Sequence, residues 1–439
     1  MSRSSPAEQS DESRMARGGV LTFLVKSVSV VASFGVQLML ARLFGKAGYG
    51  DYSFALVSLN FLVIGAVAGG DMVATRFITT YKTDPPLLFE CLRWLNRRSL
   101  FCSLFLLIVS VITIQGIRQW DDRSLWLTTQ VICLAIPFQV FSLVRQGVLR
   151  GRERPVLSVL PEGLLRPFLT LGLIGLLVDG GLFSLPDFAP VHAAAVFVVV
   201  TLATLVTGQW LQERELSGVQ KQSPANNLEA VAEWRSMGWA TLLITIAMTI
   251  HGQSDIWMLG IFVDSDQVGP YAAAAKYSAF VVFGINAVNT AFGPMIARTR
   301  NDREQLQKLA TKAAGLSFFF GLMVSMVFLL FPSPMLNFYG KGFEEASLPL
   351  RILVAGNLFN VFCGSVGALL SMSGNHQTFM KILLVSMLLN IGLNLLLVPL
   401  FQTTGAAIAT TISVIFWNGI ALVVVRRKLG IRPGLGGWV

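Results

Sequence analysis

The chain has 439 residues, of which 54% are hydrophobic and only 13% are charged, whereas a soluble domain of this size carries roughly a quarter charged residues. Its net charge of +10 comes from Lys and Arg residues scattered over short loops, without the single basic stripe and interleaved aromatics typical of nucleic-acid binding. The composition therefore excludes a soluble globular domain and a nucleic-acid partner, and it predicts a protein embedded among membrane lipids.

Apolar stretches recur from Gly19 almost to the C-terminus, and each is long enough to cross a hydrocarbon core of about 30 Å. The backbone finds no water in lipid, so these stretches must be helices. The first six are expected at residues 19–44, 48–70, 97–117, 124–148, 155–178 and 188–211. The second six are expected at residues 236–262, 268–296, 311–332, 349–373, 378–400 and 403–425. We therefore predict an all-α membrane protein with about twelve transmembrane helices.

Positive side chains fall on alternate loops of this arrangement. They precede the first span, follow every even-numbered span except the tenth, and include Arg14, Arg17, Arg93, Arg97, Arg150, Arg152, Arg214, Arg235, Arg300, Arg303, Arg426 and Arg427. The other loops carry mostly acidic residues, among them Asp121, Asp122, Asp179, Asp187, Asp264, Asp266, Glu344 and Glu345. The positive-inside rule then predicts a multi-pass protein of the inner (plasma) membrane with both termini in the cytoplasm.

The polar segments outside the spans suggest a simple division of the chain. Residues 1–17 are expected to form a disordered cytoplasmic tail, residues 213–235 a cytoplasmic linker, and residues 428–439 a second cytoplasmic tail. The first apolar run is too long for the core of a signal peptide and has no small-residue cleavage site. The remaining residues, 18–212 and 236–427, are expected to form two lobes.

An internal repeat supports the two lobes. The segments that start at Met39 and Met258 share Met, Leu, Gly and Tyr at a constant offset of 219 residues, and the match continues to Gly65 and Gly284. Six spans lie between the copies, so the repeats are predicted to be parallel and related by an axis along the membrane normal. Two parallel six-helix lobes around a central cavity are typical of transporters, and the alternative is a duplicated structural scaffold.

Small residues, prolines and amides mark places where the predicted helices turn, bend or pair. Gly45 and Gly50 permit a tight reversal between the first two spans. Pro137 and Pro161 are expected to kink the fourth and fifth spans. Asn390 and its neighbour one turn further along are expected to form hydrogen bonds between helices.

Four segments carry recognisable motifs: residues 41–53 after the first span, 145–152 at the end of the fourth, 255–271 with Lys276, and 390–399 followed by 405–410. They resemble the motifs of polysaccharide-transporter (Wzx-like) flippases in the multidrug/oligosaccharidyl-lipid/polysaccharide exporter superfamily. The resemblance runs from Gly18 to about residue 427 and implies a MATE-like fold. It also implies a flippase that moves a lipid-linked oligosaccharide of the undecaprenyl-diphosphate type to the outer leaflet by alternating access, for lipopolysaccharide or exopolysaccharide biosynthesis.

Positive side chains inside predicted spans are candidates for the substrate cavity, because an ionisable group in hydrocarbon costs at least about 2.5 kcal/mol unless it meets water or a partner. They are Lys26, Arg145, Arg166 and Lys276. An anionic head group such as a diphosphate is what Arg binds by paired hydrogen bonds. The alternatives are snorkelling or packing for the two lysines, a topology charge for Arg145, and an ion pair between Arg166 and Glu162.

Three further side chains are candidates for ion coupling. His251 and Asp255 lie about one turn apart in the seventh span and can accept a proton or a sodium ion. Asp71 lies near the inner end of the second span. The alternatives are a hydrogen bond from Asp255 to the loop entering the next span or to Lys276, and an ion pair between Asp71 and Arg76.

Other functional classes find little support in the sequence. Four cysteines show no metal-ligand spacing, and no Gly-rich loop is followed by Lys and Ser or Thr, so neither a metal, a cofactor nor catalysis is expected. Open alternatives are a cation-coupled drug or metabolite antiporter of the same superfamily, a flippase for a peptidoglycan precursor, a membrane-embedded polysaccharide-assembly enzyme and a non-transporting scaffold. Polysaccharide polymerase or export proteins are expected as partners.

Overall fold

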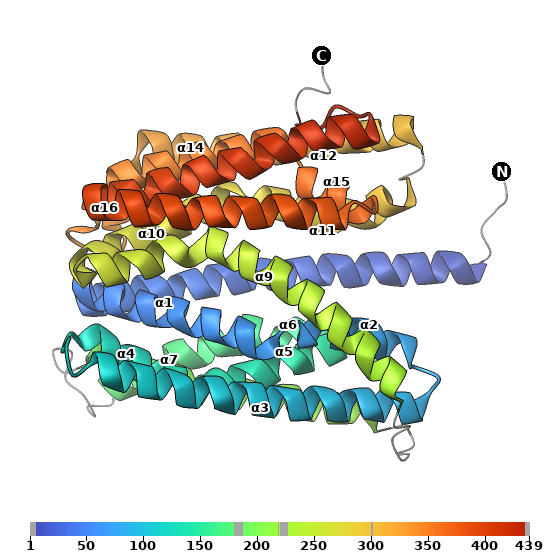
Figure 1. Cartoon of the computed structure of the whole chain (residues 1–439), viewed down its shortest axis with the longest axis horizontal. Helices are drawn as coiled ribbons and strands as arrows, with labels where there is room; N and C mark the ends of the chain where they lie inside the picture. Colours follow the sequence, from blue (N-terminus) through green and yellow to red (C-terminus); the bar gives the residue numbers. More distant parts are fainter. Residues whose placement is uncertain (1–5, 180–187, 218, 220–226, 300–301, 435–439) are drawn as a thin grey trace. The chain divides into compact units, whose positions relative to one another are not determined.

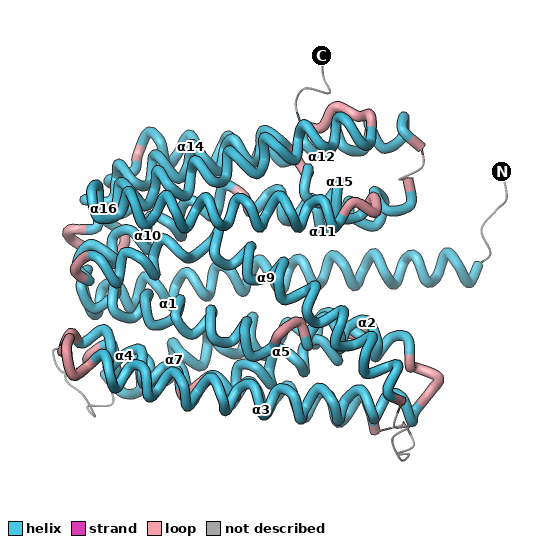
Figure 2. The backbone as a smooth tube through the Cα atoms, in the orientation of Figure 1, coloured by secondary structure: helices cyan, strands magenta, loops and turns pink. Residues whose placement is uncertain are grey.

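The structure, a computed structural model, describes residues 6–179, 188–217, 219, 227–299 and 302–434, and within these residues all regular secondary structure is helical (Figure 2). The first half of the chain contains α1 (Pro6–Val67), α2 (Gly70–Thr80), α3 (Pro85–Ile117), α4 (Ser124–Cys133), α5 (Ile136–Gly151), α6 (Pro155–Leu160), the π-helical turn η1 (Pro161–Leu165), α7 (Arg166–Asp179) and α8 (Pro190–Leu216) (Figure 1).

The second half contains α9 (Leu228–Phe262), α10 (Ser265–Val281), α11 (Phe283–Arg298), α12 (Arg303–Leu330), α13 (Pro332–Asn337), the 3-10 turn η3 (Phe343–Ala346), α14 (Ser347–Cys363), α15 (Val366–Met372) and α16 (His376–Leu429). The predicted all-α class is therefore confirmed for the described chain.

The membrane-spanning helices follow the predicted pattern. In the described residues seven helices are long and apolar enough to cross a membrane, and up to nine spans result when two bent helix pairs are each counted as one. Two of these helices, α1 and α16, contain a residue with non-helical backbone, Gly45 and Gln402, so that each is two helices joined by a break. When α1 and α16 are each counted as two helices, nine becomes eleven, and α9, which is 35 residues long, is the twelfth.

Local sequence signals explain where several helices begin and end. The side chain of Asp84 accepts a hydrogen bond from the Leu87 amide (3.2 Å) and caps α3, and two prolines occupy its first turn. In the same way, Asp302 accepts a hydrogen bond from the Gln305 amide (3.0 Å) and caps α12. A left-handed Gly430 (φ 65°) ends α16.

The structure describes parts of both predicted tails. Residues 6–17 are the first turns of α1, so the expectation of a disordered tail is wrong for them; Pro6 suits the first helical position, and the acidic residues that follow favour a helix N-terminus. At the other end, Ile431 is only 1% exposed. The backbone of Arg432 exchanges two hydrogen bonds with the Gln307 side chain (2.6 and 2.9 Å), so this segment packs against α12.

The expected kink in the fourth span is confirmed, and the fifth span is interrupted by a π-helical turn at Pro161. The helices α4 and α5 form one span that is bent by 47° just before Pro137. Pro161 opens the π-helical turn η1 between α6 and α7. A proline removes a backbone hydrogen bond and crowds the preceding turn, which accounts for both interruptions.

The chain divides into two compact units, and each contains two stretches of sequence. Unit 1 comprises Met1–Leu43 and Ser58–Thr245, and unit 2 comprises Phe44–Val57 and Ile246–Val439. The core of unit 1 is an apolar cluster from α2, α3 and α5 that closes on Trp234, a fully buried side chain in the first turns of α9. The indole of Trp234 donates a hydrogen bond to the Tyr81 hydroxyl (3.2 Å). The lobe boundaries taken from sequence stay a prediction.

Unit 2 contains a reciprocal contact between the two copies of the repeat. A Cβ placed on Gly50 would lie 2.0 Å from the Ser265 carbonyl oxygen, and a Cβ on Gly269 would lie 2.0 Å from the Lys46 carbonyl oxygen. Lys46 and Ser265, like Gly50 and Gly269, are related by the same 219-residue offset that links the repeats. Only glycine permits this backbone approach, and each copy of the repeat makes the same close contact with the other.

Candidate transport site

The two lysines of the predicted cavity are exposed on their own units. Lys26 lies in α1 of unit 1 and Lys276 in α10 of unit 2, and both side chains are accessible. Within the described part of the chain, neither has an ion-pair or hydrogen-bond partner. A protonated amine in a membrane-spanning helix must then find water, lipid phosphate or an anionic ligand.

Arg166 has local partners instead. Its Nη2 atom lies 3.1 Å from Glu162 Oε1 and donates a 2.7 Å hydrogen bond to Gln139 Oε1. Gln139 in turn donates to Glu162 Oε1 (3.2 Å), and the guanidinium lies 5.2 Å from the ring centre of Phe197. The predicted pair of Glu162 and Arg166 is confirmed, so this charge is neutralised inside unit 1.

Arg145 is buried within unit 1. Its side chain is 7% exposed, donates a hydrogen bond to Asn96 Oδ1 (3.0 Å) and lies 5.7 Å from the ring centre of Phe141. Its Nε atom has no partner among the described residues. Arg145 is therefore held between α3 and α5 and is less accessible than either lysine.

The candidates His251 and Asp255 meet in one cavity. It has a volume of about 180 Å³ and lies in unit 2 among α9, α10, α14 and α16. Asp255 is 3% exposed; its carboxylate accepts hydrogen bonds from the Tyr271 hydroxyl (2.6 Å) and the Thr410 hydroxyl (3.3 Å). Tyr271 lies within α10 and not in the loop before it, so this bond is not the expected one to the loop, and Lys276 makes no hydrogen bond or ion pair with Asp255 in the described structure.

Sequence reasoning missed most of the other groups around this cavity. Ser278, Asn357 and Thr410 also line it, and they come from three different helices. No local spacing connects these residues with Asp255. The motifs at 255–271 and 405–410 contain Tyr271 and Thr410, but nothing in the sequence indicates that these side chains meet Asp255. Among the described residues no group of three or more His, Cys, Asp or Glu side chains could hold a metal ion.

Asp71 lies elsewhere, in unit 1. Its carboxylate lies 3.4 Å from Arg150 Nη2, so the expected pair with Arg76 is wrong. A separation of five residues places Asp71 and Arg76 on different sides of the helix. Arg76 instead approaches Glu233 at 3.9 Å. Asp71 is therefore not brought together with His251 and Asp255.

The amide pair in α16 forms the expected link between helices. Ser254 in α9 donates a hydrogen bond to Asn390 Oδ1 (2.7 Å), and Asn394 donates to the Asn390 backbone oxygen (2.9 Å). All three side chains are buried. These contacts tie α9 to α16 at the residue next to Asp255, in agreement with the sequence prediction for Asn390.

The first-loop motif, at the break in α1, is held by contacts within unit 2. Lys46 Nζ donates to both oxygens of Glu345 (2.9 and 3.1 Å) and lies 3.6 Å from Asp266. These partners, above all the Glu345 carboxylate that accepts the hydrogen bond, raise the pKa of Lys46, so it stays protonated at neutral pH. Next to it, the Tyr49 ring packs against Tyr339. The sequence suggested only a tight turn here.

The paired repeats, the membrane-spanning helices and the buried polar cavity define a multi-pass membrane transporter. Solved structures with the same fold include an inward-facing multidrug resistance MATE family transporter of the MOP superfamily (TM-score 0.71, 15% identity, 94% of this chain and 98% of that one). Another is the lipid II flippase MurJ in an inward closed conformation (TM-score 0.70, 14% identity, 94% of this chain and 87% of that one).

The family follows from sequence comparison. The model of the polysaccharide biosynthesis protein family matches residues 15–300, and the MatE model matches residues 240–396. The chain belongs to the polysaccharide biosynthesis protein family, the polysaccharide flippases of the MOP superfamily. The resemblance recognised from the motifs is thereby confirmed.

Relatives from Haloferax volcanii have related names. The chain is 23% identical over 433 residues to "Probable flippase AglR", with 96% of this chain and 85% of the relative covered. It is also 23% identical over 285 residues to "Probable low-salt glycan biosynthesis flippase Agl15", with 64% of this chain and 57% of the relative covered. These names and those of the structural neighbours describe flippases and transporters.

Proposed function

We propose that this protein is a flippase for glycan biosynthesis that moves an anionic lipid-linked oligosaccharide from the cytoplasmic to the outer leaflet by alternating access. The observation that carries the proposal is the pair of accessible lysines, Lys26 and Lys276, in membrane-spanning helices of a chain from the polysaccharide flippase family. One lysine belongs to each compact unit.

The chemistry of the cargo follows from these charges. A diphosphate between a lipid tail and a sugar carries negative charge and several acceptor oxygens, and an ammonium group binds it as a compact point charge. An undecaprenyl-diphosphate carrier fits this requirement. Arg145 and Arg166 are assigned a supporting role, because their hydrogen bonds to Asn96 and Glu162 hold them within unit 1.

The cavity around Asp255 is proposed as the ion-coupling site. A carboxylate that accepts hydrogen bonds from Tyr271 and Thr410 beside His251 can take up and release one proton or a small cation as its surroundings change. Asp71 is a weaker candidate because Arg150 already neutralises it. The protein is placed in the inner membrane with both termini in the cytoplasm, and its partners are a polysaccharide polymerase or export proteins.

Deletion of the gene in its host tests the proposed function. We expect a lipid-linked oligosaccharide to accumulate on the cytoplasmic side of the membrane while the surface polysaccharide is lost, and the wild-type gene should restore both. Mass spectrometry of extracted lipids and staining of the surface polymer measure the two effects. If the lipid intermediate and the polymer stay unchanged, the flippase assignment fails.

The second candidate is a cation-coupled drug or metabolite antiporter of the same superfamily. The fold shared with the MATE transporter and the MatE model match over residues 240–396 favour it. In that case the deletion strain becomes sensitive to cationic drugs, with its polysaccharide intact. The accessible lysines argue against a cationic cargo because they would repel it.

A further inference from the structure

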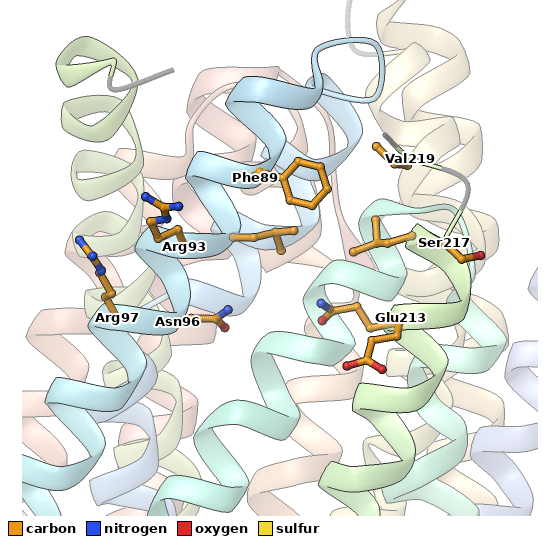
Figure 3. Close-up of a pocket in the computed structure, with 10 residues that line it drawn as sticks. Phe89, Arg93, Asn96, Arg97, Glu213, Ser217 and Val219 are labelled. Carbon is orange, nitrogen blue, oxygen red and sulfur yellow. The ribbon is translucent and has the colours of Figure 1, made fainter. Parts of the chain in front are cut away.

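A groove of about 920 Å³ lies in unit 1, with one wall from α3 and the other from α8 (Figure 3). Figure 3 shows Phe89 and Asn96 pointing from α3 into the groove, whereas the guanidinium groups of Arg93 and Arg97 point away from it. The α8 wall carries the carboxylate of Glu213. The lining therefore offers no cationic site for a phosphate.

Arg145 of α5 packs against both walls. Its guanidinium donates a hydrogen bond to Asn96 Oδ1 (3.0 Å) on α3. A Cβ placed on Gly208 of α8 would lie 3.7 Å from the Cβ of Arg145. Gly208 is one helical turn before Gln212, which lines the groove. The same buried side chain thus contacts α3 and α8, and the groove is a preformed feature of unit 1.

Two amide side chains present opposite hydrogen-bonding groups to the groove. Because Asn96 Oδ1 accepts the bond from Arg145, the Nδ2 group of Asn96 is left as a donor. Gln212 is 6% exposed, and its Oε1 atom has no donor among the described residues. A buried acceptor without a donor is destabilising, so a ligand that donates an O–H or N–H to Gln212 is favoured. The ligand must therefore carry both a donor and an acceptor.

Glu213 determines which charge the ligand can carry. Gln209 donates a hydrogen bond to Glu213 Oε1 (2.6 Å) and holds the carboxylate in place. In the described chain no group donates to Oε2, which is left for a donor from the ligand. A carboxylate attracts hydroxyl donors and repels anions. Phe89, Leu92 and Leu216 add an apolar surface. An uncharged ligand with several hydroxyl groups and an apolar face fits this lining.

We propose that this groove binds an uncharged sugar unit of the transported oligosaccharide. Sugar hydroxyls donate to Gln212 and Glu213 and accept from Asn96, and the C–H face of a sugar ring packs against Phe89. A volume of about 920 Å³ suits a drug-sized ligand, here about two sugar rings. This inference rests on the proposed flippase function. It adds a preference for uncharged over acidic sugars, because Glu213 repels a sugar carboxylate.

Saturation-transfer NMR with the full-length protein in detergent tests this assignment. The probes are oligosaccharides released from the host's surface polysaccharide by partial acid hydrolysis. They are used in two matched forms, one with every carboxyl group reduced and one with the primary hydroxyls oxidised to carboxylates.

We expect the uncharged form to bind. Asn96→Leu and Gln212→Leu should each weaken it about tenfold, since one hydrogen bond is lost. Glu213→Gln should let the acidic form bind as well, because the repulsion is removed while the bond from Gln209 can persist. Gln305→Leu, at an exposed glutamine in the first turn of α12, is the matched control and should bind like the wild type.

The stability of the Gln212→Leu variant separates sugar binding from a structural role. Leu has nearly the volume of Gln and removes the acceptor that has no donor, so the variant without sugar should melt at least as high as the wild type. Differential scanning fluorimetry without sugar measures this. A lower melting temperature would make the amide structural.

Several outcomes overturn the proposal. Binding of neither form, or wild-type binding in both leucine variants, removes the groove from sugar recognition. Tighter binding of the acidic form contradicts the role of Glu213. The binding assay involves no transport, so its result is independent of the gene deletion. A flippase confirmed by deletion but without this binding loses only the groove, whereas sugar binding without any effect of deletion removes the flippase assignment.

Discussion

The charged side chains within the membrane-spanning helices fall into two chemical situations. Arg145 and Arg166 are held by Asn96 and Glu162, whereas Lys26 and Lys276 are accessible. A charged group that already has a buried partner gains less from an additional ligand, because some of its hydrogen bonds are in use. An accessible ammonium keeps all three donors for cargo.

Replacement of Lys26 or Lys276 with Gln should reduce flipping about tenfold or more, since one charge-assisted contact to phosphate is lost. The arginine variants retain the charge and should keep most of the activity. Surface polymer in the deletion strain and flipping in proteoliposomes provide the measurements. Lys308→Gln, in the first turns of α12 and fully exposed, is the control. Wild-type rates in both glutamine variants would place the two lysines in packing.

Replacement of Glu162 with Gln should destabilise unit 1 by about 2 kcal/mol, because Arg166 is left with a partly buried, uncompensated charge. The double variant Glu162→Gln, Arg166→Gln should recover most of this stability. Thermal unfolding in detergent, followed by size-exclusion chromatography, measures both. A double variant as unstable as the single one contradicts an ion pair between these residues.

Asp255→Asn should uncouple transport from the ion gradient while the protein stays folded. The amide oxygen of Asn still accepts the hydrogen bond from Tyr271, but the side chain no longer binds a proton or a cation. Flipping in proteoliposomes with and without a proton or sodium gradient measures the effect. A variant that still responds to the gradient removes Asp255 from coupling.

At this scale, sequence predicts contacts only when they are local. The pair of Glu162 and Arg166 followed from a four-residue spacing. The bonds of Asp255 to Tyr271 and Thr410 join residues that are 16 and 155 positions apart, and no periodicity in the chain specifies them. The partner of Asp71 was mistaken for the same reason.

Among the helices, the repeat is the feature that governs packing. Gly50 and Gly269 allow the backbones of the two copies to touch in unit 2. Gly50 meets the carbonyl oxygen of Ser265, and Gly269 meets that of Lys46, the residue that corresponds to Ser265 in the first copy. Sequence predicted the twelve spans and the places where proline interrupts them because apolar length and proline position act locally. It did not predict that the helix would continue through residues 6–17.

Gly50→Ala and Gly269→Ala should each lower the thermal stability of the protein markedly, since a methyl group cannot lie 2.0 Å from a carbonyl oxygen and the helices must separate. Gly35→Ala in the same helix α1 is the matched control, because a Cβ there meets nothing within 4 Å. It should be neutral or slightly stabilising. Fluorescence-detected size-exclusion chromatography after heating compares the three. Equal melting temperatures would contradict the close approach.

Over the whole molecule, each compact unit takes a piece from the other half of the chain. The segment Phe44–Val57 belongs to unit 2, and the first turns of α9 belong to unit 1. Composition and the repeat predicted two lobes but not this exchange, because compactness depends on contacts such as Trp234 with Tyr81, across 153 positions of the chain.

A gene split within residues 218–226 should therefore yield two fragments that are each unstable alone. The first lacks Trp234, and the second lacks Lys46 with its bonds to Glu345. Co-expression should restore both fragments to the membrane and restore surface polymer. Protease resistance of each fragment alone and together measures this. A first fragment that is stable alone contradicts a role for Trp234 in the core of unit 1.

The exchange of segments between the two units also affects how the protein folds during synthesis. The ribosome synthesises α2, α3 and α5 long before it reaches Trp234. Their apolar cluster therefore stays incomplete until the first turns of α9 emerge. Residues 44–57 lack their partner for longer, because Lys46 can bind Glu345 only after Glu345 has been translated. The membrane must accommodate both segments during this interval. A stop codon before Trp234 or before Glu345 leaves an incomplete core that quality control can recognise.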